Sequence, residues 1–264
     1  MRRMQLMELE DYPWCPGFVR DGITDLLRFC WLNVLPRGGI AKSLNRALAR
    51  TGSDRVVDLC SGGGGPWIKL VKRLESGNGR DVQVLLTDLY PNKEAFSWVE
   101  KLSGGRVTGH RESVDATNVP GELSGFRTMF GAFHHFPEEL GKAIIADAVR
   151  SRQGIAIFEG MVRTPLNLAK CLGIPVGVWA VTPAIRPFSL SRMFWTYAAP
   201  AIPVATLFDG SVSCLRMYSA DELLEMAREV DDGAYEWETG GDNPIWAPVP
   251  VTWLIGWPKK AGGQ

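Results

Sequence analysis

The sequence has no excess of charge of either sign. Its 264 residues include 29 basic and 29 acidic side chains, and neither kind forms a long run. A chain with this balance does not attract nucleic acid or anionic lipid over long range, so we expect no nucleic-acid partner. The partners predicted instead are small or uncharged molecules, and the oligomeric state is left open.

Cysteine is also scarce, and its spacing excludes two kinds of scaffold. The five cysteines are odd in number, widely separated and without a C-x-x-C pair. This pattern is typical of reduced thiols and not of a disulfide framework or a zinc ribbon. We therefore expect no metal site, and a chain of this length buries enough core without one.

Apolar runs long enough to cross a membrane are lacking. The first eight residues carry arginines and an acid, with no apolar run like that of a signal peptide. Two long uncharged runs, residues 171–185 and 193–208, contain prolines and are shorter than the roughly 18 residues that a spanning helix needs. We expect a cytoplasmic protein, with a position peripheral to a membrane as the alternative.

What the sequence does have is a glycine turn after a short apolar strand. Residues 55–59 read Arg-Val-Val-Asp-Leu, and the run Gly62 to Gly65 begins three positions later. Glycine is required where the backbone takes positive φ or approaches a ligand closely. Pro66 suits a first helical position, and apolar residues then recur with helical spacing. The order strand, glycine turn, helix predicts a nucleotide site, with an ordinary tight loop as the alternative.

The glycines fit one class of nucleotide site better than another. A dinucleotide site uses G-x-G-x-x-G, for which Gly62 and Gly64 supply two glycines but Trp67 stands at the third. The stretch instead resembles the first motif of class I methyltransferases that use S-adenosylmethionine (AdoMet), an acid followed by Gly-x-Gly-x-Gly. Asp58 is the acid of that pattern, and Cys60 stands where its first glycine is usual.

Acids end the next two predicted strands. Residues 82–88 read as a buried strand that closes on Asp88, whose carboxylate can accept both hydroxyls of a ribose. Residues 107–114 read as a third strand, followed by Asp115 and Ala116. The resemblance implies that Asp115 binds the adenine amino group and that the next amide binds a ring nitrogen; the alternative is that Asp115 only caps its turn. In full, the resemblance assigns cofactor contacts to Asp58, Ser61, Gly62, Gly64, Asp88, Leu89, Asp115, Ala116, Phe130 and Gly131.

Candidate catalytic residues follow the fourth and fifth predicted strands. The fourth strand, within residues 126–136, runs into a loop with His134 and His135, and in the resembled family this loop faces the methionine part of the cofactor. Either histidine could hold an acceptor or take its proton near neutral pH, or could merely pack there. Glu159 ends the fifth strand and is a second candidate base. The loop lacks the Asn/Asp-Pro-Pro-aromatic pattern of base-amine methyltransferases, which disfavours a nucleobase acceptor.

Two regions are candidates for the acceptor pocket. Residues 18–32 and 40–50 read as helices, and the resemblance places such helices over cofactor and acceptor; a purely structural collar is the alternative. Residues 161–208 are apolar, aromatic and rich in proline. We expect this segment to form a lid, with an in-plane membrane contact as the alternative. The residues predicted to contact the substrate are Trp14, Arg20, Trp179, Trp195 and Tyr197.

The C-terminal part completes the predicted fold. Ser219 and Glu222 form a capping box that opens a helix over residues 220–230. Residues 235–239 and 251–257 read as two strands that pair antiparallel. We therefore predict an α/β fold with a seven-stranded, mostly parallel, doubly wound sheet and a closing antiparallel hairpin. Its predicted parts are an N-terminal helical cap (residues 1–51) and an AdoMet-binding domain (residues 52–264) with an apolar helical lid insertion (residues 161–213).

The predicted function is AdoMet-dependent methyl transfer to a lipophilic or aromatic small molecule at O, N or C, with secondary metabolism as one setting. Such a displacement needs aligned reactants and exclusion of water, and a base only where the acceptor is poorly acidic. One alternative is a nicotinamide-dependent reductase, which the missing third glycine and the closing hairpin disfavour. Another is a non-catalytic protein that binds AdoMet or lipid.

Overall fold

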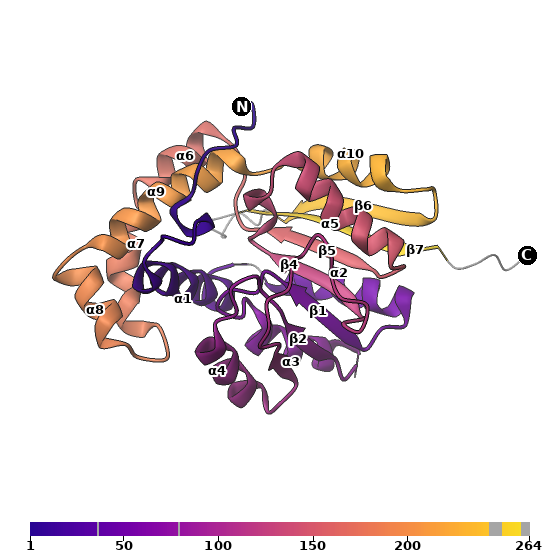
Figure 1. Ribbon diagram of the computed structural model, residues 1–264, viewed down its shortest axis with the longest axis horizontal. Coiled ribbons are helices and arrows are strands. Elements are labelled where there is room, and N and C mark those ends of the chain that lie inside the picture. The colour runs from indigo at the N-terminus through magenta and orange to yellow at the C-terminus, as the bar shows by residue number, and fades with distance from the viewer. Residues whose placement is uncertain (36, 79, 243–249, 260–264) are drawn as a thin grey trace, which may run out of the picture.

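The computed structural model describes residues 1–35, 37–78, 80–242 and 250–259. Its centre is a seven-stranded sheet with the order β3-β2-β1-β4-β5-β7-β6 (Figure 1). The first five strands are parallel, whereas β7 runs antiparallel to both β5 and β6. The predicted doubly wound sheet with its closing antiparallel strands is therefore confirmed. The strands are β1 (Arg55–Leu59), β2 (Gln83–Leu86), β3 (Val107–Gly109), β4 (Phe126–Phe130), β5 (Ile155–Glu159), β6 (Tyr235–Asp242) and β7 (Val251–Pro258).

The strand order reverses at β1, which pairs with β2 on one side and with β4 on the other. In open α/β sheets ligands bind beyond the carboxyl ends of the strands at this point. Two strands are shorter than predicted. The strand β2 ends at Leu86 and not at residue 88, and its partner β3 therefore ends at Gly109 and not near residue 114. The predicted connection between β6 and β7 falls mainly on residues 243–249, outside the described residues.

Helices cover both faces of the sheet. One face carries α2 (Arg37–Thr51), α3 (Trp67–Asn78) and α4 (Lys93–Ser103), and the other carries α5 (Glu138–Arg150) and α10 (Ala220–Val230). Successive strand residues alternate between the two cores, so Val56 faces the first and Val57 the second. The helix α2 belongs to the first core, and the division of the chain at residue 51 stays a prediction.

The predicted capping box opens α10. Ser219 Oγ accepts the amide of Glu222 at 3.2 Å, and Glu222 Oε2 accepts the amide of Ser219 at 2.7 Å. Both bonds satisfy backbone donors that the helix itself leaves without partners. This local signal fixes the start of the helix at the residue that the sequence predicts.

The lid is helical and lies beside the sheet with the N-terminal segment (Figure 1). The lid packs closely on α1, because a Cβ at Gly22 of α1 would lie only 2.5 Å from Ile202 Cδ1 of α9. The N-terminal segment is tied to the same layer, since the Leu9 amide donates to Asp209 Oδ1 at 2.8 Å. The helices of this layer are η1 (Leu9–Asp11), α1 (Gly17–Asn33), η2 (Phe133–His135), α6 (Pro165–Cys171), α7 (Ile174–Val181), η3 (Thr182–Ala184), α8 (Leu190–Tyr197) and α9 (Ala201–Arg216).

Within the part of the chain that the structure describes, no single helix is both long and apolar enough to span a bilayer. Two bent pairs of lid helices, residues 165–171 with 174–184 and residues 190–197 with 201–216, reach that length and composition only together.

Candidate active site

The glycine turn between β1 and α3 is built on left-handed backbone. Gly62, Gly64 and Gly65 have φ values of +50°, +94° and +50°. Cys60, which stands where the resembled motif usually has its first glycine, also has a positive φ, of +53°. Four positions of the turn therefore have the glycine-type conformation, and the side chain of Cys60 is accommodated at some cost in backbone strain.

Asp58 supports this turn from beneath. The side chain is buried, and its carboxylate accepts from Ser61 Oγ at 2.8 Å and from Thr128 Oγ1 at 2.6 Å. Burial raises the pKa of Asp58 to about 7, while the two hydroxyl donors favour its charged form. Asp58 does not line the cleft described below. In this structure Asp58 therefore supports the turn and does not face the cleft, as its predicted contact with the cofactor would require.

Gly64 faces α4 and not the cleft, because a Cβ at this position would lie 2.7 Å from Val99 Cγ2. We expect Gly64→Ala to lower the free energy of unfolding by about 1–3 kcal/mol, through positive φ and the clash. Urea unfolding measures the loss. In a Val99→Ala background, Gly64→Ala should lower the free energy of unfolding by less, because the clash with Val99 is gone. A Gly64→Ala variant of unchanged stability would contradict this placement.

Asp88 joins the glycine turn to the loop after β2. Its Oδ2 accepts the amide of Gly62 at 2.8 Å, and its Oδ1 accepts the amide of Tyr90 at 2.9 Å. Burial raises the pKa of Asp88, and the two amide donors oppose that rise. A carboxylate has about four lone-pair positions, so about two remain for the hydroxyls of a ligand.

A polar cleft with a volume of about 190 Å³ opens beside this carboxylate at the carboxyl ends of β1, β2 and β4. Since Gly62 and Gly65 carry no side chain, their backbone borders the cleft directly. The predicted cofactor residues that line it are Ser61, Gly62, Asp88, Phe130 and Gly131. The site thus lies at the switch point where a nucleotide is expected.

The remaining predicted cofactor residues do not line the described cleft. Leu89 is exposed, and Ala116 is buried in the second core. Asp115 is exposed, and its Oδ1 accepts from the amide and the hydroxyl of Thr117, both at 2.8 Å. This is the turn cap that the sequence left open as an alternative. A contact between Asp115 and an adenine stays a prediction.

An apolar cavity with a volume of about 360 Å³ lies under the lid. Its walls come from α1, α7, α9 and the turn η2. The cavity and the polar cleft adjoin, and Trp31 stands edge-on to Phe130 at this boundary, with 5.4 Å between ring centroids. The residues that line both spaces are Glu10, Leu27, Trp31, Gly131 and His135.

The N-terminal substrate candidates have different positions. Arg20 lines the polar cleft, and its guanidinium carbon lies 5.3 Å from the ring centroid of Tyr90. Trp14 is exposed and stacks on Tyr12, with 5.6 Å between ring centroids. Trp14 lines neither the cleft nor the cavity, so the prediction that it contacts the acceptor disagrees with the structure.

The predicted lid aromatics pack within the lid layer and do not line the cavity. Trp179 Nε1 donates to the carbonyl of Thr196 at 3.1 Å, and the Tyr197 hydroxyl donates to the carbonyl of Trp179. Trp195 stacks on Phe18 of α1, with 4.0 Å between ring centroids. Their rings and polar atoms hold the lid together, and a contact of these three side chains with the acceptor stays a prediction.

Glu159 braces the turn η2 from within the protein. Its Oε1 accepts the amides of Phe133 at 2.7 Å and His134 at 3.2 Å, and its Oε2 lies 2.8 Å from His134 Nδ1. A carboxylate only accepts, so Nδ1 carries the proton of this bond. Glu159 is fully buried and lines neither space, so its prediction as a general base in the crevice is wrong.

His135 lies on the wall that the cleft and the cavity share. Its Nδ1 is 2.6 Å from Asp11 Oδ1 and 3.5 Å from Glu8 Oε2, and its Nε2 is 3.6 Å from Glu10 Oε1. Burial opposes protonation of this ring, but the three carboxylates outweigh burial and raise the pKa of His135 to about 10. A ring that is already protonated does not accept a proton, which disagrees with its prediction as a general base.

Sequence reasoning missed the acids of η1 and the arginine that pairs with them. Arg216 of α9 is buried, and it donates to the carbonyl of His134 at 3.1 Å and to Asp11 Oδ2 at 2.5 Å. It also missed Arg28 of α1, which donates to the carbonyls of Gly63 at 3.1 Å and Arg186 at 2.7 Å. These pairs link distant segments, and no local pattern in the sequence marks them.

Sequence comparisons with protein-family models and with curated proteins give no match. Comparison with solved structures gives several matches. The CMeT domain of the citrinin polyketide synthase superposes with a TM-score of 0.56 at 12% identity, over 94% of this chain and 59% of that one. A putative Zn-dependent alcohol dehydrogenase from Rhodobacter sphaeroides gives a TM-score of 0.51 at 12% identity, over 96% and 99% of the two chains.

A third structure, of the plantazolicin methyltransferase BamL with S-adenosylhomocysteine, gives a TM-score of only 0.46 at 12% identity, over 91% of this chain and 98% of that one. At such identities the comparisons concern the fold alone. The antiparallel β7 between β5 and β6 completes the assignment. The chain has the class I methyltransferase fold.

Proposed function

We propose that this chain transfers a methyl group from AdoMet to an apolar small molecule. The observation that carries the proposal is the junction of a polar cleft, at the switch point of the sheet, with an apolar cavity under the lid. One space suits a charged nucleoside and the other a lipophilic acceptor. Their common wall is where the two reactants would meet.

The residues of the cleft fit AdoMet. Asp88 has acceptor positions left for ribose hydroxyls, and the backbone at Gly62 leaves room where a side chain would intrude. Phe130 and Gly131 continue this lining from the end of β4. When bound, AdoMet supplies a methyl group that its sulfonium has already activated.

The chain's own part in the reaction is alignment and exclusion of water. Trp31 and Leu27 form an apolar boundary between the two spaces, which favours a dry contact between reactants. His135 stands at the same boundary, where its Nε2–H can donate a hydrogen bond to an acceptor oxygen. An acceptor that is acidic enough to lose its own proton suits this arrangement.

A nicotinamide-dependent reductase is the competing proposal. Trp67 occupies the place of the third glycine of a dinucleotide motif, and it is fully buried against Phe130, with 5.6 Å between ring centroids. The test is an assay with methyl-labelled AdoMet and a panel of lipophilic phenols. We expect label in an apolar product and an equal amount of S-adenosylhomocysteine; reduction of a carbonyl panel by NADPH without methyl transfer would contradict the proposal.

We further propose that the outer surface of the lid contacts a membrane. Residues 161–208 contain four basic residues and no acidic one, although the whole chain is balanced. The exposed large apolar residues on or beside the lid helices are Leu166, Leu172, Val176, Trp179, Phe188, Leu190, Phe194, Tyr197, Val204 and Phe208. Arg163 and Arg192 pair with Glu222 and Asp25, which leaves the exposed Lys170 and Arg186 beside these apolar side chains. This combination suits an anionic bilayer surface.

Co-sedimentation with phosphatidylcholine vesicles, with and without phosphatidylserine, tests this contact. We expect binding that the anionic lipid strengthens and that Leu172→Lys with Leu190→Lys reduces. The matched control is Leu102→Lys on α4, which is also an exposed leucine. Absence of binding, or a dimer that buries the two lid leucines, would contradict the proposal.

A further inference from the structure

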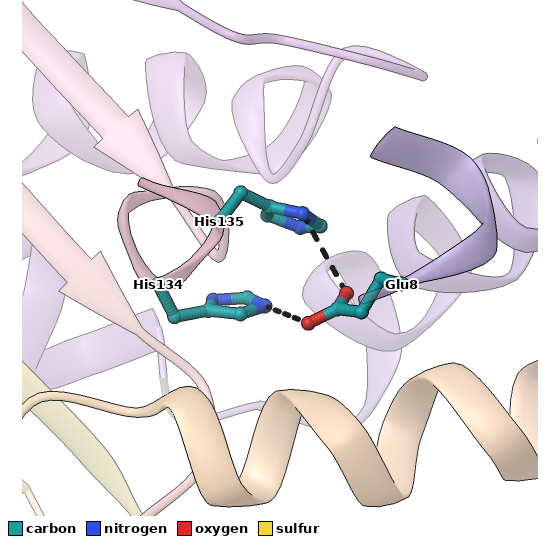
Figure 2. Close-up of side chains that lie close together, drawn as sticks. All are labelled: Glu8, His134 and His135. Carbon is teal, nitrogen blue, oxygen red and sulfur yellow. Dashed lines mark ion pairs between the residues drawn. The ribbon is translucent and has the colours of Figure 1, made fainter. Parts of the chain in front are cut away.

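Three side chains from distant parts of the sequence converge beside the apolar cavity. Figure 2 shows the rings of His134 and His135 and the carboxylate of Glu8 pointing toward one another. Glu8 Oε1 lies 3.8 Å from His134 Nε2, and Glu8 Oε2 lies 3.5 Å from His135 Nδ1. One ligand atom from each residue lies within 4.8 Å of the other two. Both histidines line the cavity, so the cluster borders a space that a ligand can enter.

The described part of the cluster contains buried polar atoms without a hydrogen bond, although Arg216 Nη1 lies 3.2 Å from Glu8 Oε1. Glu8 is 0% exposed and His134 is 4% exposed. Among the described residues, three of these atoms have no hydrogen-bond partner: both carboxylate oxygens of Glu8 and Nε2 of His134. Leaving such groups unpaired is costly, and each needs an explanation. A cation placed between them would satisfy all three atoms at once.

Glu159 makes this requirement sharper. Because His134 donates its Nδ1 proton to Glu159, a neutral His134 ring presents a bare lone pair at Nε2, facing the oxygens of Glu8. An acceptor nitrogen that faces a carboxylate is repelled by it unless a cation lies between them. A histidine whose second nitrogen donates to a carboxylate is also the usual arrangement around a bound metal, where the outer bond orients the ring.

We propose that Glu8, His134 and His135 bind a divalent transition-metal ion. Two imidazoles and a carboxylate are a ligand set typical of zinc and of iron(II). Two ligand atoms at about 2.1 Å from one metal, with tetrahedral angles, lie about 3.4 Å apart. The separations of 3.5 and 3.8 Å between ligand atoms are therefore close to those of a formed site. At His135 the ion would replace the Nδ1 proton that Asp11 Oδ1 accepts, and that proton would leave to solvent.

The surrounding charge favours a cation. Three further carboxylates stand next to the cluster: Glu10 and Asp11 contact His135, and Asp209 accepts the amide of Leu9. The charge that opposes a cation comes from Arg216, whose Nη1 lies 3.2 Å from Glu8 Oε1, and from Arg3, which donates to the carbonyl of Arg216. With Glu8 and Glu159 included, five carboxylates face two guanidinium groups.

The ion would have two consequences. It would tie the N-terminal segment, through Glu8, to the turn that follows β4. A three-ligand site also leaves an open coordination position, and here it would face the cavity. Binding of an acceptor oxygen at that position rests on the proposed methyl transfer, whereas the metal site itself does not.

Calorimetric titration of the full chain with Zn²⁺, and with Co²⁺ followed by its visible absorption, tests the site directly. We expect one ion per chain, and a loss of affinity of more than about 100-fold in Glu8→Gln, His134→Asn and His135→Asn, since loss even of an outer hydrogen-bond partner costs about 10–100-fold. His110→Asn is the matched control, because His110 is the remaining histidine of the chain. Glu159→Gln, which keeps the ligands, should weaken binding by about 10–100-fold.

A second measurement needs no variant. The chain has three histidines, so the imidazole nitrogen spectrum of the unmodified protein is simple. We expect Zn²⁺ to shift the signals of two rings and to leave the third unchanged. Absence of one-to-one binding, binding that survives all three ligand substitutions, or unshifted histidine signals would each overturn the site. AdoMet titration of the same sample separates this outcome from failure of the proposed methyl transfer.

Discussion

Replacement of Asp88 by alanine is expected to weaken AdoMet binding by about 100-fold or more. The carboxylate accepts the amides of Gly62 and Tyr90 and still has positions for ribose hydroxyls. Hydrogen bonds to a charged group are worth about 1.5–3 kcal/mol each, and about 2.7 kcal/mol corresponds to a hundredfold change in affinity. Loss of the carboxylate therefore removes both the ligand contact and the support of the glycine turn.

Calorimetry with AdoMet measures this loss, and thermal unfolding of the same sample checks that the variant is folded. Asp88→Asn keeps one carbonyl acceptor, so its affinity for AdoMet should lie between those of the unchanged protein and of Asp88→Ala. Asp81→Ala, at an exposed aspartate before β2, should bind as the unchanged protein does. Full affinity in a folded Asp88→Ala variant would remove the ribose assignment.

Filling the apolar cavity should separate acceptor binding from cofactor binding. Cys30 of α1 lines the cavity but not the cleft. Burial raises the pKa of its thiol to about 11, so its replacement removes no charge at neutral pH. We expect Cys30→Trp to lower affinity for a lipophilic aromatic probe such as 2-naphthol by about 100-fold, since pocket contacts of this size are worth 1–3 kcal/mol.

AdoMet affinity should stay the same in this variant, because Cys30 does not line the cleft. Cys30→Ala is the matched control and should bind both molecules normally, since the smaller side chain of alanine takes up no space in the cavity. Unchanged probe binding in Cys30→Trp would place the acceptor outside the cavity. Loss of AdoMet binding as well would mean that the larger ring displaces α1 and closes both spaces.

The sequence predicts the fold well because the fold depends on local patterns. A buried apolar run that ends in a glycine turn defines β1 and α3, and the capping box at Ser219 defines the start of α10. The predicted antiparallel closing pair is also confirmed. The error at β3 has a different origin, since the length of an edge strand is set by its partner, and β2 ends at Leu86.

The site is predicted less completely because its important contacts link distant residues. Motif spacing identifies Asp88 and Gly62, which are both in the cleft. It also selects Asp58 and Glu159, but side-chain direction places both beneath the site, where they support loops. Glu8 and Arg216 are missed altogether, since their contacts to His134 of the turn η2 cross 126 and 82 positions of sequence.

The most direct test of the central claim is calorimetric titration of the unmodified protein with AdoMet, S-adenosylhomocysteine and NADPH. The polar cleft, with Asp88 beside the glycine turn, predicts one-to-one binding of the first two ligands and none of the third. Binding of NADPH alone would contradict the assignment of the cleft to AdoMet and, with it, the proposed methyl transfer.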